Sequence, residues 1–221
     1  MRSYIIKPKS VRKNAIFEKK YSFSSFTYRF VESKNRNYFL LGSDEILDKN
    51  VKGFEPGSKE YIDFSHNYFV RISEMDNSNF TFTTSKDTKK IRPVENPNKL
   101  KVIDQGDICY QTASNVGNVC IYVGSRAFYN SHIRKLSFKK NKYYVLAILK
   151  SAFGKEQVDV SGSIKGVDNF REEYLLNTKI PLPTKSNHSN PEQVENFISL
   201  ITQNIIDKEQ QVKLKNKRID E

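Results

Sequence analysis

The chain has 221 residues, enough for one sizeable hydrophobic core with a small appendage. Its 37 lysines and arginines against 25 aspartates and glutamates give a formal net charge of +12. Such an excess favours a polyanionic partner, either nucleic acid or an acidic membrane surface, over a merely solubilising role. No apolar run approaches the ~18 residues of a membrane span, and the N-terminus lacks an apolar signal core, so we expect a cytoplasmic protein that does not enter membranes.

Basic and aromatic residues are interleaved through the first 36 residues. This stretch holds ten lysines and arginines but only two acidic residues, Glu18 and Glu32. Aromatic residues alternate with small or polar ones from residue 21 to residue 30, which predicts a strand. The segment is interpreted either as a basic arm that lies on DNA phosphates or as an edge strand whose lysines deter aggregation.

Short β-rich pieces are predicted between residues 38 and 101. The runs 68–73 and 80–83 have the composition of strands. The polar stretch 86–101 is punctuated by Pro93 and Pro97 and is expected to be a surface loop.

Three or four successive strands are predicted over residues 106–138. Residues 108–112 alternate with the period of a strand, 119–123 is an apolar run, and two further strands follow, the last ending near Phe138. The polar loop 114–118 contains a glycine and two asparagines, which suit tight or positive-φ backbone. Cys109 and Cys120 fall in neighbouring strands without a C-x-x-C spacing, so reduced core thiols are preferred to a zinc site.

The amide and hydroxyl side chains at the turns of these strands are candidates for reading DNA, because bidentate side chains discriminate base edges. Basic residues are assigned to phosphates, including one on the glycine-bearing loop 161–166, where glycine lets the backbone approach a ligand closely. A plain turn is the alternative for that loop. The candidate DNA-binding residues are Gln111, Ser114, Asn115, Asn118, Ser131, His132, Arg134 and Lys165.

Two helices are predicted in the second half of the chain. Residues 143–153 are apolar on nearly every side, so this helix is expected to be buried against the sheet, with Gly154 ending it. The last helix begins with Asn190 as N-cap and Pro191 as its first residue, and it continues to Glu221 without glycine or further proline.

Apolar residues of the last helix follow the a and d positions of a heptad pattern. They are Val194, Ile198, Ile201, Ile205, Val212 and Ile219. Because a lone amphipathic helix needs a packing partner, these residues are expected to form an association surface. Docking of the helix on its own domain is the alternative, and it fits residues 194–205 better than those beyond 212.

The sequence contains no recognisable catalytic motif. Residues 96–99, Asn-Pro-Asn-Lys, depart from the Asn-Pro-Pro-Tyr pattern of adenine methylation at two positions. The sequence has no glycine-rich nucleotide loop and no metal-ligand cluster of histidine or cysteine. Glu172 and Glu173 form an acidic pair at a helix start, which the helix dipole explains. We therefore expect neither intrinsic enzyme activity nor a bound metal or cofactor.

The order of these elements resembles the target-recognition domain of type I restriction–modification specificity (S) subunits, which also occurs at the C-terminus of fused restriction–methylation enzymes. The motifs that carry the resemblance cover about half the chain. They are GDI at 106–108, AFYNSHI at 127–133, YYVLAILKSAFG at 143–154, GS at 162–163, IPLP at 180–183 and the long last helix. The resemblance implies an α+β fold, with a β-rich recognition domain over residues 1–185 and a long helix over residues 186–221.

The resemblance also implies a function: sequence-specific recognition of double-stranded DNA, which directs a methyltransferase and restriction partner to its site. Adenine methylation with S-adenosylmethionine then belongs to a partner DNA adenine methyltransferase. S subunits use such long helices to space two recognition domains and to hold methyltransferase subunits. With one recognition domain and one helix, this chain is expected to be either a self-associating half-subunit or a fragment of a longer protein, and the stop at Glu221 within the heptad pattern favours the fragment.

Two other classes of function stay open. One is a basic nucleic-acid-binding protein without base readout, which would bind unrelated DNA equally well and with a steep salt dependence. The other is an adaptor that binds only proteins through the last helix, which would bind no DNA at low salt.

Overall fold

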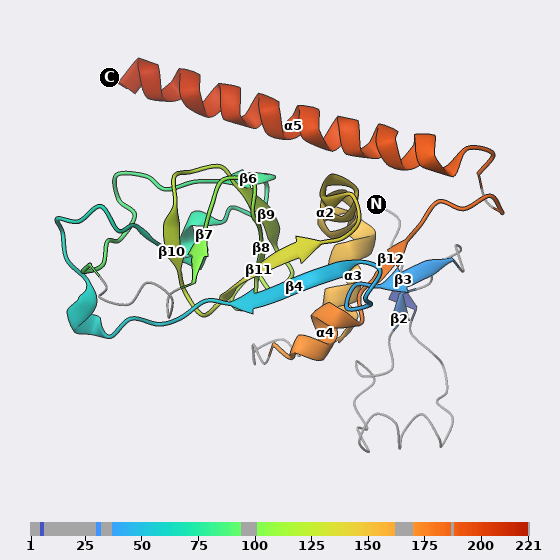
Figure 1. Cartoon of the computed structure of the whole chain (residues 1–221), viewed down its shortest axis with the longest axis horizontal. Coiled ribbons are helices and arrows are strands. Elements are labelled where there is room, and N and C mark those ends of the chain that lie inside the picture. The colour runs from blue at the N-terminus through green and yellow to red at the C-terminus, as the bar shows by residue number, and fades with distance from the viewer. Residues whose placement is uncertain are drawn as a thin grey trace.

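The structure is a computed structural model, and it describes residues 5–6, 30–31, 37–93, 101–161, 170–186 and 188–220. Short strands dominate the first two thirds and helices the last third (Figure 1). The strands are β1 Ile5–Ile6, β2 Phe30–Val31, β3 Tyr38–Leu40, β4 Leu47–Lys52, β5 Phe69–Val70, β6 Thr81–Phe82, β7 Val102–Ile103, β8 Ile108–Gln111, β9 Val119–Tyr122, β10 Ala127–Tyr129, β11 Ile133–Phe138 and β12 Lys179–Pro181. The α-helices are α2 Lys142–Lys150, α3 Ala152–Ser161, α4 Glu172–Leu176 and α5 Pro191–Asp220, and the 3-10 helices are η2 Ser58–Glu60 and η3 Ile72–Glu74.

A five-stranded sheet in the order β4-β11-β8-β9-β6 forms the centre of the molecule. Its strands pair antiparallel except for β6, which runs parallel to β9 at one edge. A three-stranded sheet, β5-β10-β7, lies beside it, and β12 pairs with β3. These strands and α5 give the α+β fold that the sequence predicts, with the four strands of residues 106–138 where they were expected.

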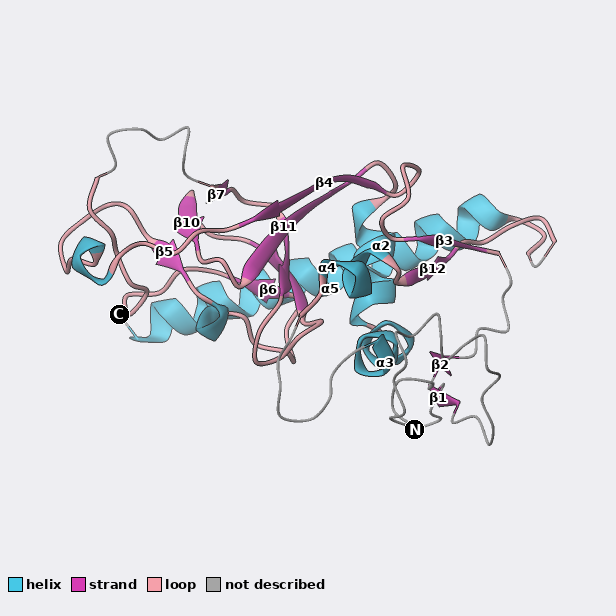
Figure 2. Ribbon diagram, turned by 90° about the horizontal axis from the view of Figure 1, so that it is seen from below, coloured by secondary structure: helices cyan, strands magenta, loops and turns pink. Residues whose placement is uncertain are grey.

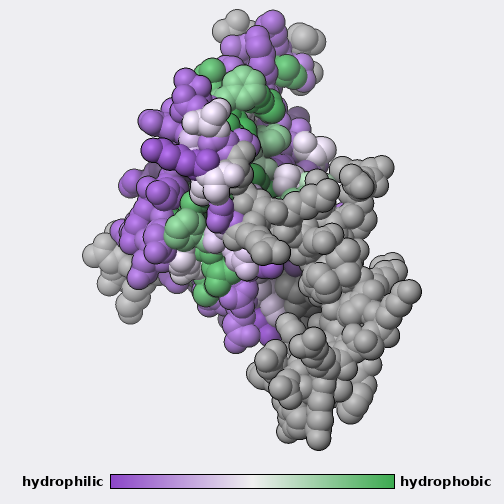
Figure 3. All heavy atoms as spheres, turned by 90° about the vertical axis from the view of Figure 1, so that its right-hand side faces the viewer, coloured by the Kyte–Doolittle hydropathy of each residue, from purple (hydrophilic) through white to green (hydrophobic). Residues whose placement is uncertain are grey.

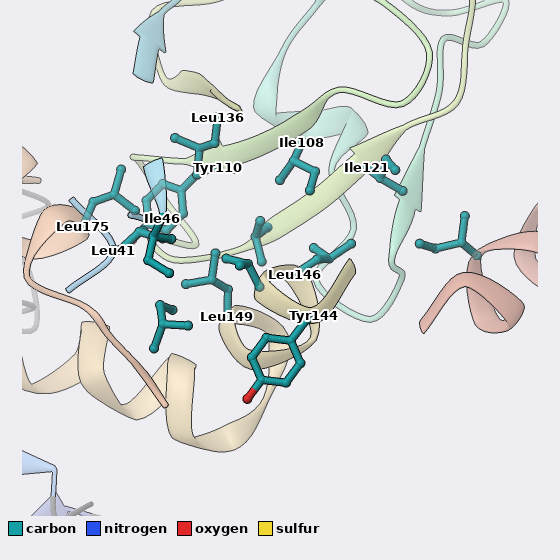
Figure 4. Close-up of a cluster of buried hydrophobic side chains, with 14 residues drawn as sticks. Leu41, Ile46, Ile108, Tyr110, Ile121, Leu136, Tyr144, Leu146, Leu149 and Leu175 are labelled. Carbon is teal, nitrogen blue, oxygen red and sulfur yellow. The ribbon is translucent and has the colours of Figure 1, made fainter. Parts of the chain in front are cut away.

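Two apolar clusters cover the two faces of the central sheet. Alternate residues of β8 and β9 divide between them, as the period of two requires: Ile108 and Tyr110 face α2, whereas Cys109 and Cys120 face the side of β5 and β10. In Figure 4, Tyr110, Ile108 and Leu136 of the sheet lie opposite Leu146 and Leu149 of α2. Both cysteines are buried and reduced, as expected.

The predicted helix over residues 143–153 is confirmed as α2 as far as Lys150, but its end is wrong, because the chain breaks at Ser151 and starts a new helix at Ala152. The Ser151 hydroxyl donates to the carbonyl of Ile148 at 2.6 Å and accepts from the backbone N–H of Gly154 at 3.2 Å. Gly154 therefore lies inside the first turn of α3 and does not end a helix. A Cβ at this position would collide with the carbonyl of Ile148, so glycine allows the tight corner between α2 and α3.

The predicted last helix is confirmed as α5, which has Pro191 as its first residue. Figures 1 and 2 show it running from the β3–β12 end of the molecule to the end that holds β5 and β10. Its inward side packs on α2 and β6, with Ser199, Thr202 and Ile206 buried. None of the helices in the described ranges is long and apolar enough to cross a membrane.

Two predicted segments lie partly outside the described residues. Of the strand predicted over residues 21–30, the structure describes only Phe30, which pairs in β2 with β1. In the connection 86–101, residues 94–100 are not described. Its first part is no simple surface loop, because Ile91 is buried and forms a β-bridge with Tyr61.

Candidate nucleic-acid interface

The loop between β8 and β9 has the positive-φ backbone that its sequence predicts. Gly117 has φ 88°, and Ser114 has φ 61°, the only positive φ of a residue other than glycine in the described ranges. The N–H of Gly117 donates to the carbonyl of Gln111 at 3.1 Å, and the N–H of Asn118 donates to the carbonyl of Asn115 at 3.0 Å. These bonds fold the loop tightly and leave the side chains of Ser114 and Asn115 exposed.

Gln111 and Asn118 do not lie at the surface, so the expectation that they contact DNA is wrong for these two residues. Each is 2% exposed. The Gln111 amide donates to the carbonyl of Ala113 at 2.8 Å, and the Asn118 amide donates to the carbonyl of Met75 at 3.1 Å. Buried amides need internal hydrogen-bond partners. Here the partners are the carbonyl of Ala113 within the loop and the carbonyl of Met75 in the neighbouring segment. Gln111 and Asn118 therefore hold the loop in shape and do not reach a ligand.

A half-buried cation next to this loop was missed from the sequence. The Lys150 ammonium at the end of α2 donates to Asn118 Oδ1 at 3.0 Å and lies 5.8 Å from the ring centroid of Phe80. Burial lowers the pKa of Lys150. The sequence does contain a signal for this contact, because Lys150 is the one charged residue in the apolar run 143–153.

The turn between β10 and β11 lies directly beside this loop. The backbone N–H and the hydroxyl of Thr112 both donate to the carbonyl of His132, at 2.8 and 3.0 Å. On the other side of the turn, the N–H and hydroxyl of Ser131 donate to Glu55 Oε1, at 3.2 and 2.8 Å. The His132 side chain is exposed and that of Ser131 is half-buried.

Three loops that are distant in sequence therefore adjoin: residues 112–117, 130–132 and 54–67. We call their exposed side the three-loop surface. It displays the amide of Asn115, the hydroxyl of Ser114 and the imidazole of His132 on backbone fixed by the bonds described above. Rigidly held groups of this kind can discriminate hydrogen-bond donors and acceptors, which is the chemistry of base-edge readout.

Arg134 is not available for a phosphate. Its guanidinium pairs with the Glu172 carboxylate at 2.7 Å, donates to Asn50 Oδ1 at 3.2 Å and covers the ring of Phe170, and the side chain is only 12% exposed. The expectation of a free phosphate contact is therefore wrong for Arg134. Glu172 lies in the first turn of α4, where its carboxylate complements the helix dipole and also pairs with Arg134. Lys165 lies outside the described residues.

The outward face of α5 forms a second candidate surface, made of apolar residues. Near the first turns of α5, Figure 3 shows apolar side chains among hydrophilic ones. A groove of about 520 Å³ runs beside Ile201, Ile205 and Val212, with Lys208 also lining it. We call the outward-facing residues the α5 stripe: Phe197, Ile201, Ile205 and Val212, which are 38–63% exposed.

The remaining residues of the predicted heptad pattern are not part of this exposed stripe. Val194 and Ile198 are half-buried, and Ile198 packs against the core cluster beneath α2. The side chain of Ile219 lies outside what the structure describes. The fully buried apolar residue of the described part of the helix is Ile206, which the heptad pattern does not select.

No protein-family model matches the chain. No curated protein matches it at a significant level either.

Solved structures do match. One is a chain from a structure described as the basis of complex assembly and conformational transition of the type I R-M system: 15% identity, TM-score 0.53, covering 86% of this chain and 45% of the other. Another is the HsdS subunit from Thermoanaerobacter tengcongensis: 16% identity, TM-score 0.52, covering 85% of this chain and 41% of the other. The chain thus spans less than half the length of these proteins and shares its fold with them, which confirms the fold that the sequence resemblance implies.

Proposed function

We propose that this chain recognises a specific sequence of double-stranded DNA as the specificity component of a type I restriction–modification system. The observation that carries the proposal is the three-loop surface, which lies on a fold shared with type I specificity subunits. The excess of basic residues over the whole chain supports a polyanionic partner.

In this proposal Asn115 and Ser114 face the DNA bases. An asparagine amide can pair in a bidentate manner with adenine N6 and N7 in the major groove, and a serine hydroxyl can donate or accept. His132 and Ser131 lie next to them through the Thr112–His132 contact. Lys165 and the basic N-terminal arm are proposed to bind phosphates, which orient a protein on DNA without reading its sequence.

Catalysis is assigned to partners in this proposal. A DNA adenine methyltransferase would bind S-adenosylmethionine and modify the site, and restriction subunits would cleave DNA. The recognition unit corresponds to residues 1–185, and the helix over residues 186–221 presents the α5 stripe to the methyltransferase or to a second copy of this chain. The stripe supports the assignment because an exposed apolar strip of this kind marks an association surface.

The test begins with selection from a pool of randomised DNA duplexes by the wild-type chain. Enrichment of one sequence is the expected result. Asn115→Ala should then weaken binding to the selected duplex by about 1–3 kcal/mol and leave unselected DNA unaffected. The matched control is Gln211→Ala, which removes an exposed amide from α5 and should change neither affinity. Equal affinity of the wild type and Asn115→Ala for the selected duplex would remove Asn115 from the readout.

A basic nucleic-acid-binding protein without base readout is the second candidate, favoured by the net charge of +12. It predicts that selection enriches no sequence and that affinity falls steeply with salt for every duplex alike.

A further inference from the structure

Phe64 is the most exposed large apolar residue in the described part of the chain. Its side chain is 93% exposed, compared with 63% for Phe197 on α5. Single exposed apolar residues are ordinary on protein surfaces. Phe64 differs from such scattered residues because it lies at the tip of a loop whose base is held by hydrogen bonds.

The backbone on both sides of Phe64 is held by hydrogen bonds. The N–H of Ile62 donates to the carbonyl of Lys90 at 3.1 Å, and the carbonyl of Asn67 accepts from the N–H of Ile91 at 3.0 Å. The N–H of Asn67 also donates to Ser65 Oγ at 3.0 Å. Residues 63–66 therefore form a short tip on a closed base, and the ring of Phe64 is presented from a fixed position.

This tip belongs to the third loop of the three-loop surface. The base of the loop is fixed by ring contacts of Phe69 with Phe54 and with Tyr61, whose centroids lie at 5.4 and 5.8 Å. Glu55, in the same loop, binds Ser131 at the turn beside the readout loop. The loop that carries Phe64 is therefore bonded to the same turn as the readout loop, which contacts it through Thr112 and His132.

Charges around the tip indicate which part of a duplex it can meet. Lys89 and Arg92 are exposed on the segment that closes the loop and suit nearby phosphates, whereas the loop itself exposes Lys59 together with Glu55 and Glu60. Asp63, next to Phe64, is also exposed. A carboxylate is repelled by the narrow minor groove with its concentrated negative potential. In the wide major groove it can accept from amino groups of cytosine, while an apolar ring can pack on the methyl group of thymine.

We propose that Phe64 is a DNA contact whose ring packs against base edges in the major groove, next to the bases read by the 112–117 loop. The inference rests on the proposed function and deepens it by extending the readout surface to the 63–66 tip. Asp63 and Phe64 then add specificity at positions beyond the reach of Asn115.

The first test uses the duplex selected by the wild-type chain. Phe64→Ala should bind it about tenfold more weakly, while Phe64→Leu, which retains an apolar contact, should lose much less. Both variants should bind an unselected duplex like the wild type and keep its melting temperature, because the side chain is almost fully exposed. Leu214→Ala is the control, an exposed apolar residue on α5 outside the α5 stripe, and should bind DNA normally.

The second test uses fluorescence. The chain has no tryptophan, so Phe64→Trp places a single reporter at the tip. The emission of this variant should change when the selected duplex binds. Replacing the thymines of that duplex by deoxyuridine should weaken wild-type binding more than binding by Phe64→Ala.

The two possible failures are distinguishable. If the wild type selects a sequence but Phe64→Ala binds it equally well and the emission of Phe64→Trp is unchanged, the inference is wrong and the proposed function stands. If the wild type selects no sequence at all, the proposed function is wrong and the inference falls with it.

Discussion

Glu209 of α5 and Thr81 of β6 are joined by two hydrogen bonds across 128 residues of sequence. The Glu209 carboxylate accepts from the N–H and the hydroxyl of Thr81 at 2.8 and 2.7 Å, and it also accepts from the N–H of Phe80 at 2.9 Å. One turn later, the Lys213 ammonium donates to the carbonyl and hydroxyl of Thr81. The helix therefore occupies the outer side of β6, the edge strand of the central sheet, and these bonds fix α5 well beyond its midpoint.

Glu209→Ala should lower the free energy of unfolding by about 1–3 kcal/mol, because it leaves the part-buried N–H groups of Phe80 and Thr81 without a partner. Denaturant unfolding measures the loss, and amide hydrogen exchange should show faster exchange at Phe80 and Thr81. Gln211→Ala, at an exposed position of the same helix, is the control and should change little. Unaltered exchange at β6 in Glu209→Ala would show that the carboxylate does not hold the strand.

Arg134→Ala should destabilise the protein by about 1–3 kcal/mol, since it removes charged hydrogen bonds to Glu172 and Asn50. The salt dependence of DNA binding should stay the same, whereas loss of a true phosphate contact would lower the slope by about one. Lys52→Ala is the control for charge, because Lys52 is exposed and lies opposite Arg134 in the sheet. A reduced salt slope without any loss of stability would reverse the assignment of Arg134.

Ile205→Asp combined with Val212→Asp should abolish association through α5, because it places two charges within the α5 stripe. The recognition core should stay folded, since the buried apolar contact of this helix is made by Ile206. Analytical ultracentrifugation with and without the methyltransferase, alongside thermal melts, measures both effects.

Leu214→Asp is the control for this variant. Leu214 is 61% exposed, but at 100° per residue it lies on the opposite side of the helix from Ile205. Association should therefore survive this change. A wild type that stays monomeric and ignores the methyltransferase would contradict the association surface.

The stability of the protein should fall as the pH rises above 9.0, partly through Cys109. Burial raises the pKa of this thiol well above its ordinary value of 9.0. Above pH 9.0 the unfolded thiol therefore loses its proton while the folded one keeps it, so the native state binds more protons and stability decreases. Under reducing conditions, Cys109→Ala should show a shallower decrease in chemical denaturation at a series of pH values. An identical pH dependence in the two proteins would mean that Cys109 makes no contribution.

Several elements follow from local sequence alone. The strands of residues 106–138 were predictable because successive side chains of a strand point to opposite faces of the sheet. This gives the hydrophobic pattern of the sequence a period of two residues. The start of α5 was predictable because Pro191 suits the first turn of a helix and the chain beyond it contains no residue that breaks one. The positive φ of Gly117 likewise follows from residue type, since glycine has no Cβ to clash in that conformation.

Burial and pairing of polar residues were decided only by tertiary structure. Gln111 and Asn118 have the residue types of a readout loop, yet both are buried, and Asn118 bonds to Met75 and Lys150, which are distant in sequence. By residue type Arg134 could bind a phosphate, but in the fold α4 places Glu172 against its guanidinium. A local pattern records which face of an element is apolar, but a polar side chain can equally meet solvent, a ligand or a distant partner. Only the packing of α2, α4 and α5 on the sheet selects among these, because desolvation makes an unpaired polar group costly and forces each buried one to find its partner.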